Sequence, residues 1–268
     1  MFQQFYGFTR SPFSKDIPAN DLFPADGQME LSARLDFLIR ERGLGLLTGE
    51  TGSGKSTAIR RFVANIDANR HSVIYLSNPL LGMRGIYREL LSALGHEPLF
   101  NCSKMVTSIR SAFNDLINSK RRIPFLILDE AHLLPSLAFE QFRLLFSTNM
   151  DSQSLGTLLL VGQPSLRHTL HLTIHEAFYQ RLTTTYHLAP LDLSQTIAYI
   201  HHHIQFAGFL SGTLFTDDAI SCIFDHTKGI PRLINRLCTH AMIASAIENK
   251  NLIEDSTVRK AIADLDQV

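Results

Sequence analysis

Residues 49–57 read Gly49-Glu50-Thr51-Gly52-Ser53-Gly54-Lys55-Ser56-Thr57, a glycine, four further residues and then Gly-Lys-Ser. The apolar segment before this stretch, 44–48, predicts a buried strand, and residues 58–63 after it predict a helix. Backbone N–H groups around the inner glycines and the positive helix N-terminus favour a bound anion. Lys55 can then reach the β- and γ-phosphates, and the Ser56 hydroxyl can hold Mg²⁺. The alternative is a glycine-rich turn with a chance Lys-Ser, but the flanking strand and helix favour a phosphate-binding loop.

The composition excludes several classes of protein. The chain has 268 residues, enough for one large and one small domain, and its 25 Lys and Arg balance its 25 Asp and Glu. Without net charge, binding to nucleic acid or an anionic membrane needs a local basic patch. The N-terminus lacks the regions of a signal peptide, and no apolar run reaches transmembrane length, so no membrane insertion is expected. The three cysteines have no metal spacing and predict reduced, cytosolic thiols.

A pair of acids follows the apolar strand expected at 124–128. Asp129 and Glu130 come directly after it, at the carboxyl end, where parallel sheets form nucleotide sites. We expect Asp129 to orient Mg²⁺ through its water shell and Glu130 to polarise the water that attacks the γ-phosphate. A strand at 72–76 and two helices separate these acids from the phosphate-binding loop. An inserted strand is typical of the phosphate-loop proteins that carry a catalytic glutamate.

Two further strands complete five alternating units of strand and helix. The strand at 157–161 ends in Gly162-Gln163-Pro164, and Gln163 is placed to sense the γ-phosphate or to hold the attacking water. Arg181 comes just before the last strand, at 183–188, where a residue can project into the nucleotide of a neighbouring subunit. The alternative for Arg181 is an ordinary exposed arginine.

From Pro190 the pattern is entirely helical, with helices expected at about 194–207, 217–226, 231–249 and 256–265. Thr216 is the expected N-cap of the second of these helices. Gly229 ends that helix and Pro231 begins the next, followed at once by Arg232. Because a helix start fixes the direction of its side chains, Arg232 can point at the phosphates from a lid domain.

Residues 1–30 carry many aromatic residues and prolines, which indicates a structured segment. Extended Pro-Phe segments can lie over an adenine ring, and Pro12 and Phe13 are the candidates here. The alternative is plain packing against the core. A helix is expected next, at about 29–42.

These motifs, in this order, resemble AAA+ ATPases of the ExeA type, to which transposition-regulator ATPases of the MuB and TnsC kind are related. The matching pieces span almost the whole chain: Phe5-Tyr6-Gly7-Phe8 with Pro12-Phe13, Leu47-Thr48-Gly49-Glu50, Leu128-Asp129-Glu130-Ala131, Leu160-Val161-Gly162-Gln163-Pro164, Gln180-Arg181 and Gly229-Ile230-Pro231-Arg232-Leu233-Ile234-Asn235. The resemblance implies Walker A at Gly49–Ser56, Walker B at Asp129 and Glu130, sensor one at Gln163, an arginine finger at Arg181 and sensor two at Arg232. It also implies ATP and Mg²⁺ as cofactors, and a ring or helical homo-oligomer with ATP between subunits.

The expected fold class is α/β, a three-layer phosphate-loop NTPase of the AAA+ kind with a parallel five-stranded sheet and a C-terminal helical lid domain. The expected divisions are an aromatic and proline-rich segment near the nucleotide at 1–30, the ATPase domain at 31–189 and the lid at 190–268.

The expected function is a Mg²⁺-dependent ATPase of the bacterial cytoplasm that assembles on double-stranded DNA and recruits or activates a transposase. Proteins of the ExeA type continue into a membrane span and a cell-wall-binding region, whereas this chain ends at Val268, which favours a stand-alone version over a truncated one. The expected contacts to DNA phosphates are Arg84, Lys104, Arg110 and Arg121. Arg121 lies in a basic cluster that a solvated helix end also explains. Two alternatives stay open: an ATPase for assembly of a type II secretion apparatus, and an ATP-gated scaffold with little hydrolysis.

Overall fold

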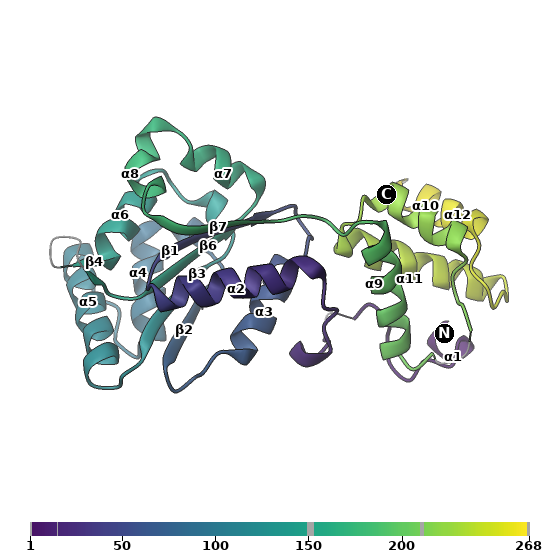
Figure 1. Cartoon of the computed structure of the whole chain (residues 1–268), viewed down its shortest axis with the longest axis horizontal. Coiled ribbons are helices and arrows are strands. Elements are labelled where there is room, and N and C mark those ends of the chain that lie inside the picture. The colour runs from purple at the N-terminus through teal and green to yellow at the C-terminus, as the bar shows by residue number, and fades with distance from the viewer. Residues whose placement is uncertain (1, 15, 149–152, 210–211, 267–268) are drawn as a thin grey trace. The chain divides into compact units, whose positions relative to one another are not determined.

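Figure 1 shows the computed structural model, which describes residues 2–14, 16–148, 153–209 and 212–266. The chain divides into two compact units. The α/β unit consists of Met29–Gly49 and Ala58–Leu188, and the helical unit of Met1–Gln28, Glu50–Thr57 and Ala189–Val268. Each unit has hydrophobic cores of its own. The division therefore groups the N-terminal segment and most of the glycine-rich stretch with the C-terminal helices.

A parallel five-stranded sheet in the order β2-β3-β6-β1-β7 forms the centre of the α/β unit, as predicted. Its strands are β1 (Leu44–Gly49), β2 (His71–Leu76), β3 (Ile123–Leu128), β6 (Thr157–Gly162) and β7 (Leu182–Leu188). The acidic strand β3 lies two places from β1, with β6 between them. A small antiparallel ribbon of β4 (Ser147–Thr148) and β5 (Gln153–Ser154) was not predicted.

Helices cover both faces of this sheet and give the three predicted layers. They are α2 (Asp26–Arg40), α3 (Lys55–Asn65), α4 (Gly82–Ala93), α5 (Cys102–Asn118), α6 (Leu137–Phe146), α7 (Pro164–Leu170) and α8 (Glu176–Tyr179). On β3, Leu126 and Leu128 pack in the core with α4, α5 and α6, whereas Phe125 and Ile127 pack with α2 and α3. Successive side chains of a strand point to opposite faces, so a strand buried on both faces is apolar throughout.

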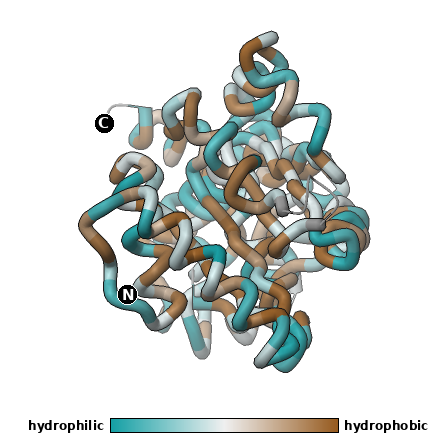
Figure 2. Tube along the Cα trace, turned by 90° about the vertical axis from the view of Figure 1, so that its left-hand side faces the viewer, coloured by the Kyte–Doolittle hydropathy of each residue, from teal (hydrophilic) through white to brown (hydrophobic). Residues whose placement is uncertain are grey.

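The helical unit packs around a single core. Its main helices are α9 (Leu193–Phe206), α10 (Asp217–Thr227), α11 (Pro231–Ile247) and α12 (Asp255–Asp266). The predicted N-cap of α10 is confirmed, because Thr216 Oγ1 accepts a hydrogen bond from Ala219 N at 3.2 Å. Figure 2 shows hydrophobic and hydrophilic residues alternating along the chain, the pattern of helices that bury one face.

The N-terminal segment, with the short helix α1 (Phe2–Phe5), belongs to this helical unit. Tyr6 and Phe8 are buried in its core. The Tyr6 hydroxyl donates to Lys250 O at 3.2 Å, and Thr9 N donates to Ala207 O at 2.9 Å. Packing within this unit therefore accounts for the aromatic residues of the segment.

Candidate functional site

The glycine-rich stretch leaves the carboxyl end of β1 at Gly49 and enters α3 at Lys55. Gly52 and Gly54 have φ angles of 87° and 98°, in the left-handed region that glycine adopts without the strain of a side chain. Lys55 is buried, and its Nζ donates to Glu50 O at 2.9 Å across the loop. The loop is thus closed on itself at the start of an eleven-residue helix. This is the backbone arrangement that binds phosphate groups.

Ser53 supports this interpretation of the loop. It is buried, and its Oγ has no hydrogen-bond partner within the described residues. A buried polar group without a partner costs about 1–3 kcal/mol, so it calls for an explanation. A hydroxyl left without a partner beside left-handed glycines fits a loop shaped for a polar ligand.

Arg232 lies against the backbone of the same loop. Arg232 N donates to Gly52 O at 3.2 Å, and a Cβ added at Gly52 would come within 2.6 Å of Arg232 Cβ. Gly229 lies two residues before α11 begins, and its φ of 72° is in the left-handed region. A Cβ there would meet Leu191 O at 1.8 Å. Pro231 and Arg232 therefore lie at the start of α11. This helix start comes so close to the loop only because positions 52 and 229 are glycines.

Asp129 follows β3 and is 4% exposed. Its N–H donates to Leu76 O at 2.9 Å, which extends the β2–β3 pairing by one residue. Its Oδ1 accepts Glu130 N at 2.9 Å, and its Oδ2 accepts the Tyr75 hydroxyl at 2.6 Å. A carboxylate that accepts a hydrogen bond at each oxygen suits the predicted role of orienting a metal ion.

Glu130 occupies a left-handed backbone conformation, with φ 53°. Non-glycine residues rarely adopt it, and such strain often accompanies function. The Glu130 side chain is half exposed, and its Oε2 lies 3.5 Å from Nδ1 of the mostly buried His132. The carboxylate is thus accessible to water, as a residue that polarises water must be.

The strand order determines which of these residues share an edge of the sheet. The strands of a parallel sheet all run in one direction, so the carboxyl ends of β1, β3 and β6 lie on the same side of the sheet, next to one another. Gln163 follows β6, which lies between the other two strands, and it precedes α7. Gly162 leaves little room at this point, because a Cβ would lie 3.2 Å from His132 N. Gln163 therefore follows the strand next to the one that Asp129 and Glu130 follow.

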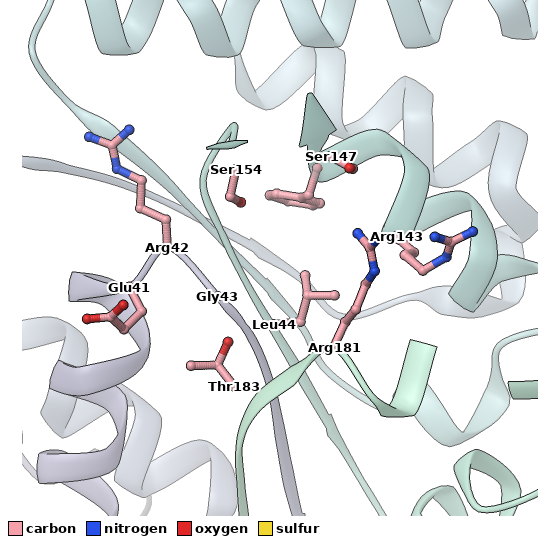
Figure 3. A pocket seen from close by; sticks show the side chains of 10 residues that line it. Glu41, Arg42, Gly43, Leu44, Arg143, Ser147, Ser154, Arg181 and Thr183 are labelled. Carbon is pink, nitrogen blue, oxygen red and sulfur yellow. The ribbon is translucent and has the colours of Figure 1, made fainter. Parts of the chain in front are cut away.

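Arg181 lies on the opposite side, at the amino ends of the strands, directly before β7 begins. It lines a cavity of about 340 Å³ between the starts of β1 and β7 and the end of α6. Figure 3 shows Arg181 and Arg143 on one side of this cavity and Arg42 on the other. A strand of seven residues is roughly 20 Å long, so Arg181 is far from the acids of its own chain.

The four candidate DNA contacts fall into different surroundings. Arg84 is exposed, with Cζ 4.6 Å from the ring centre of Phe100, which precedes α5. Lys104 is exposed in the first turn of α5, so it shares this end with Arg84. Arg121 follows α5 at its other end, roughly 25 Å away by helix length. Arg110 is half-buried, and its guanidinium donates to Leu144 O, which favours a packing role.

Pro12 and Phe13 are buried in the helical unit. The Phe13 ring stacks on His203, with centroids 5.2 Å apart and planes 20° from parallel. Burial and, to a smaller extent, the neighbouring His202 together lower the pKa of His203 to about 3. His203 is therefore a neutral core residue that occupies one face of the Phe13 ring. Sequence reasoning did not identify His203, Tyr75 or His132 as part of these arrangements.

A family model and a curated protein match this chain. Residues 39–170 match the family model described as AAA domain. General secretion pathway protein A of Aeromonas hydrophila is 32% identical over 252 residues, which cover 91% of this chain and 45% of that protein. The chain thus spans less than half the length of this curated relative. Within the described residues, no helix is long and apolar enough to cross a membrane.

Solved structures share the fold at low sequence identity. Cdc6p from Pyrobaculum aerophilum aligns with a TM-score of 0.68 and 16% identity, over 98% of this chain and 70% of its own. A structure of Drosophila ORC bound to DNA aligns with a TM-score of 0.69 and 14% identity, over 98% of this chain and 65% of its own. The RuvB branch migration motor of Thermotoga maritima aligns with a TM-score of 0.57 and 16% identity, over 91% and 70%. The fold is that of AAA+ phosphate-loop proteins, with a helical C-terminal region.

Proposed function

We propose that this chain, whose residues 39–170 match the AAA domain model, binds ATP with Mg²⁺ and hydrolyses it. The observation that carries the proposal is the phosphate loop, closed by Lys55 on Glu50 and contacted by Arg232 at Gly52. Its left-handed glycines and the start of α3 present backbone N–H groups to an anion.

Each residue of the site has a proposed role. Lys55 neutralises the β- and γ-phosphates, and Ser56 and Asp129 hold Mg²⁺, which stabilises charge developing on the phosphates. Glu130 accepts a proton from the attacking water, and Gln163 holds that water or senses the γ-phosphate. Arg232 reports the presence of the γ-phosphate from the helical unit. Glu50, Thr51, Ser53, Thr57, Pro12, Phe13 and Pro231 complete the proposed ATP contacts.

Arg181 acts in a neighbouring subunit in this proposal, as an arginine finger. Its place at the edge of the sheet opposite to Asp129 and Glu130 supports this role, because it cannot reach across its own sheet. The protein then works as a ring or helical homo-oligomer with ATP between subunits. Hydrolysis of this ATP would then loosen the contact between neighbouring subunits.

The proposed setting is assembly on double-stranded DNA in the bacterial cytoplasm, where the oligomer recruits or activates a transposase, as the resemblance to transposition-regulator ATPases implies. Arg84 and Lys104 support a contact to the DNA backbone, because both are exposed at the same end of the α4–α5 pair. Two of the structures that share the fold are of proteins bound to DNA. Arg121 and Arg110 are weaker candidates because of their positions.

A second candidate function is an ATPase for assembly of a type II secretion apparatus. The similarity to general secretion pathway protein A over 91% of this chain favours it. An ATP-gated scaffold with little hydrolysis is a variant of either setting, and the half-exposed Glu130 argues against it.

Fluorescence anisotropy of a labelled duplex, with a slowly hydrolysed ATP analogue, tests the DNA proposal. Each phosphate contact should cost about 3.5-fold in affinity between 50 and 200 mM salt. Arg84→Ala and Lys104→Ala should each lower the salt slope by about 1, whereas Arg110→Ala should leave it unchanged. Negative-stain imaging of the same samples shows whether rings or filaments form. ATP-dependent assembly without any DNA binding at either salt concentration would rule out the DNA function and leave the secretion function.

A further inference from the structure

Tyr75 reaches Asp129 from the neighbouring strand. Tyr75 on β2 pairs with Ile127 on β3, and Asp129 comes two residues after Ile127, directly past the end of β3. Residues two apart on a strand share a face, so Tyr75 and Asp129 are diagonal neighbours on one face of the sheet. An aromatic side chain can span that diagonal distance. The resulting hydrogen bond, from the Tyr75 hydroxyl to Asp129 Oδ2, is 2.6 Å long.

The two ends of this bond lie in different surroundings. Asp129 is 4% exposed, whereas Tyr75 is 48% exposed on the edge strand of the sheet. A hydroxyl that donates to an ionised carboxylate at 2.5–2.7 Å makes a charge-assisted bond, about twice as strong as a neutral one. This bond gives the Tyr75 hydroxyl a defined direction at the surface of the sheet.

The bond also controls the orientation of the Asp129 carboxylate. Oδ1 accepts Glu130 N, within the turn that gives Glu130 its left-handed backbone, and Oδ2 accepts Tyr75. With both oxygens held, the carboxylate plane has a defined rotation.

We propose that Tyr75 is a positioning residue for the Mg²⁺ site, which acts by orienting the carboxylate of Asp129. The inference rests on the proposed function, since it assumes that Asp129 takes part in holding the metal ion. Partners of this kind around a metal ligand set its orientation, and their loss typically lowers metal affinity by 10–100-fold.

Binding of a fluorescent ATP analogue, titrated first with EDTA present and then with Mg²⁺, tests the inference without measuring turnover. Tyr75→Phe keeps the ring and removes only the hydroxyl. Its nucleotide affinity in EDTA should match the unmodified protein, and the Mg²⁺ concentration for half-maximal enhancement should rise by about 10-fold or more. Tyr186→Phe, on the opposite edge strand β7, is the matched control and should leave both values unchanged.

A double variant separates positioning from a general structural effect. In the Asp129→Asn background, Tyr75→Phe should shift the Mg²⁺ dependence no further, because the carboxylate that it orients is gone. An unchanged Mg²⁺ dependence in Tyr75→Phe, or an equal further shift in the Asp129→Asn background, would overturn the inference while the proposed function stands. An unmodified protein that binds no nucleotide would overturn both.

Discussion

Gly52→Ala tests whether the phosphate loop and the start of α11 are packed as closely as the structure shows. Two costs add up at this position. An alanine at φ 87° is strained by roughly 1–2 kcal/mol in the left-handed region. Its Cβ would also lie 2.6 Å from Arg232 Cβ, an overlap with a rigid atom that costs roughly 1–3 kcal/mol to relieve. The total destabilisation of the helical unit is about 2–5 kcal/mol.

A second substitution isolates the overlap from the backbone strain. Arg232→Gly removes the Cβ that the new methyl group meets, whereas Arg232→Ala keeps it. Gly52→Ala combined with Arg232→Gly should therefore be less destabilised than the sum of the single variants, by about 1–3 kcal/mol. Combined with Arg232→Ala, the costs should be additive.

Native-state hydrogen exchange of the α11 amides measures these differences, because it reports the free energy of opening for that helix. Intrinsic tryptophan fluorescence is not an option, since the sequence contains no Trp. A coupling of 1–3 kcal/mol corresponds to about a 5–150-fold change in protection. Equal coupling with Arg232→Gly and Arg232→Ala would refute the reasoning, because contact through the Cβ atom could not then be the cause.

Four further predictions concern other residues. Lys55→Ala should abolish nucleotide binding and ATP-dependent assembly, measured by the fluorescent analogue and by light scattering; intact assembly with ATP would contradict the phosphate loop. Arg181→Ala should leave nucleotide affinity unchanged and lower turnover in a phosphate-release assay by up to about 10³–10⁵-fold, and normal turnover would assign it to packing. Gly229→Ala should lower the urea midpoint by the equivalent of about 3 kcal/mol or more, since its Cβ would meet Leu191 O at 1.8 Å. His203, with a pKa of about 3 when folded and 6.5 when unfolded, takes up a proton on unfolding, so stability should fall as pH drops below 6.5, by about 2 kcal/mol at pH 5. His203→Phe should remove that part of the pH dependence, as urea unfolding at pH 5 and pH 8 would show.

Much of the α/β unit was predictable from the sequence because its signals are local. Strands buried on both faces are continuous apolar runs, so those expected at 44–48, 72–76 and 157–161 match β1, β2 and β6 within one residue at each end. Glycine spacing marked the phosphate loop, since only glycine adopts its left-handed positions without strain. Thr216 could be identified as the N-cap of α10 because the cap and its helix are neighbours in sequence.

Contacts that depend on tertiary packing were not predictable in this way. The Tyr75–Asp129 bond requires the register between β2 and β3, which neither strand specifies by itself. The stacking of the Phe13 ring on His203 joins residues 190 positions apart, so no local pattern indicates it. Helix α6 was not predicted, although its buried residues Phe139, Phe142 and Phe146 have the spacing of a helix.

The position of β6 in the sheet gives the candidate site a fixed dimension. Neighbouring strands lie about 4.8 Å apart, so the ends of β1 and β3, with β6 between them, are about 9.5 Å apart. This spacing is set by backbone hydrogen bonds, and side-chain substitutions cannot alter it. A strand order with β3 directly beside β1 would halve the separation between Gly49 and Asp129. The strand order therefore sets the distance between the carboxyl ends of β1 and β3. Changes in sequence can alter which side chains lie between these ends, but not the distance itself.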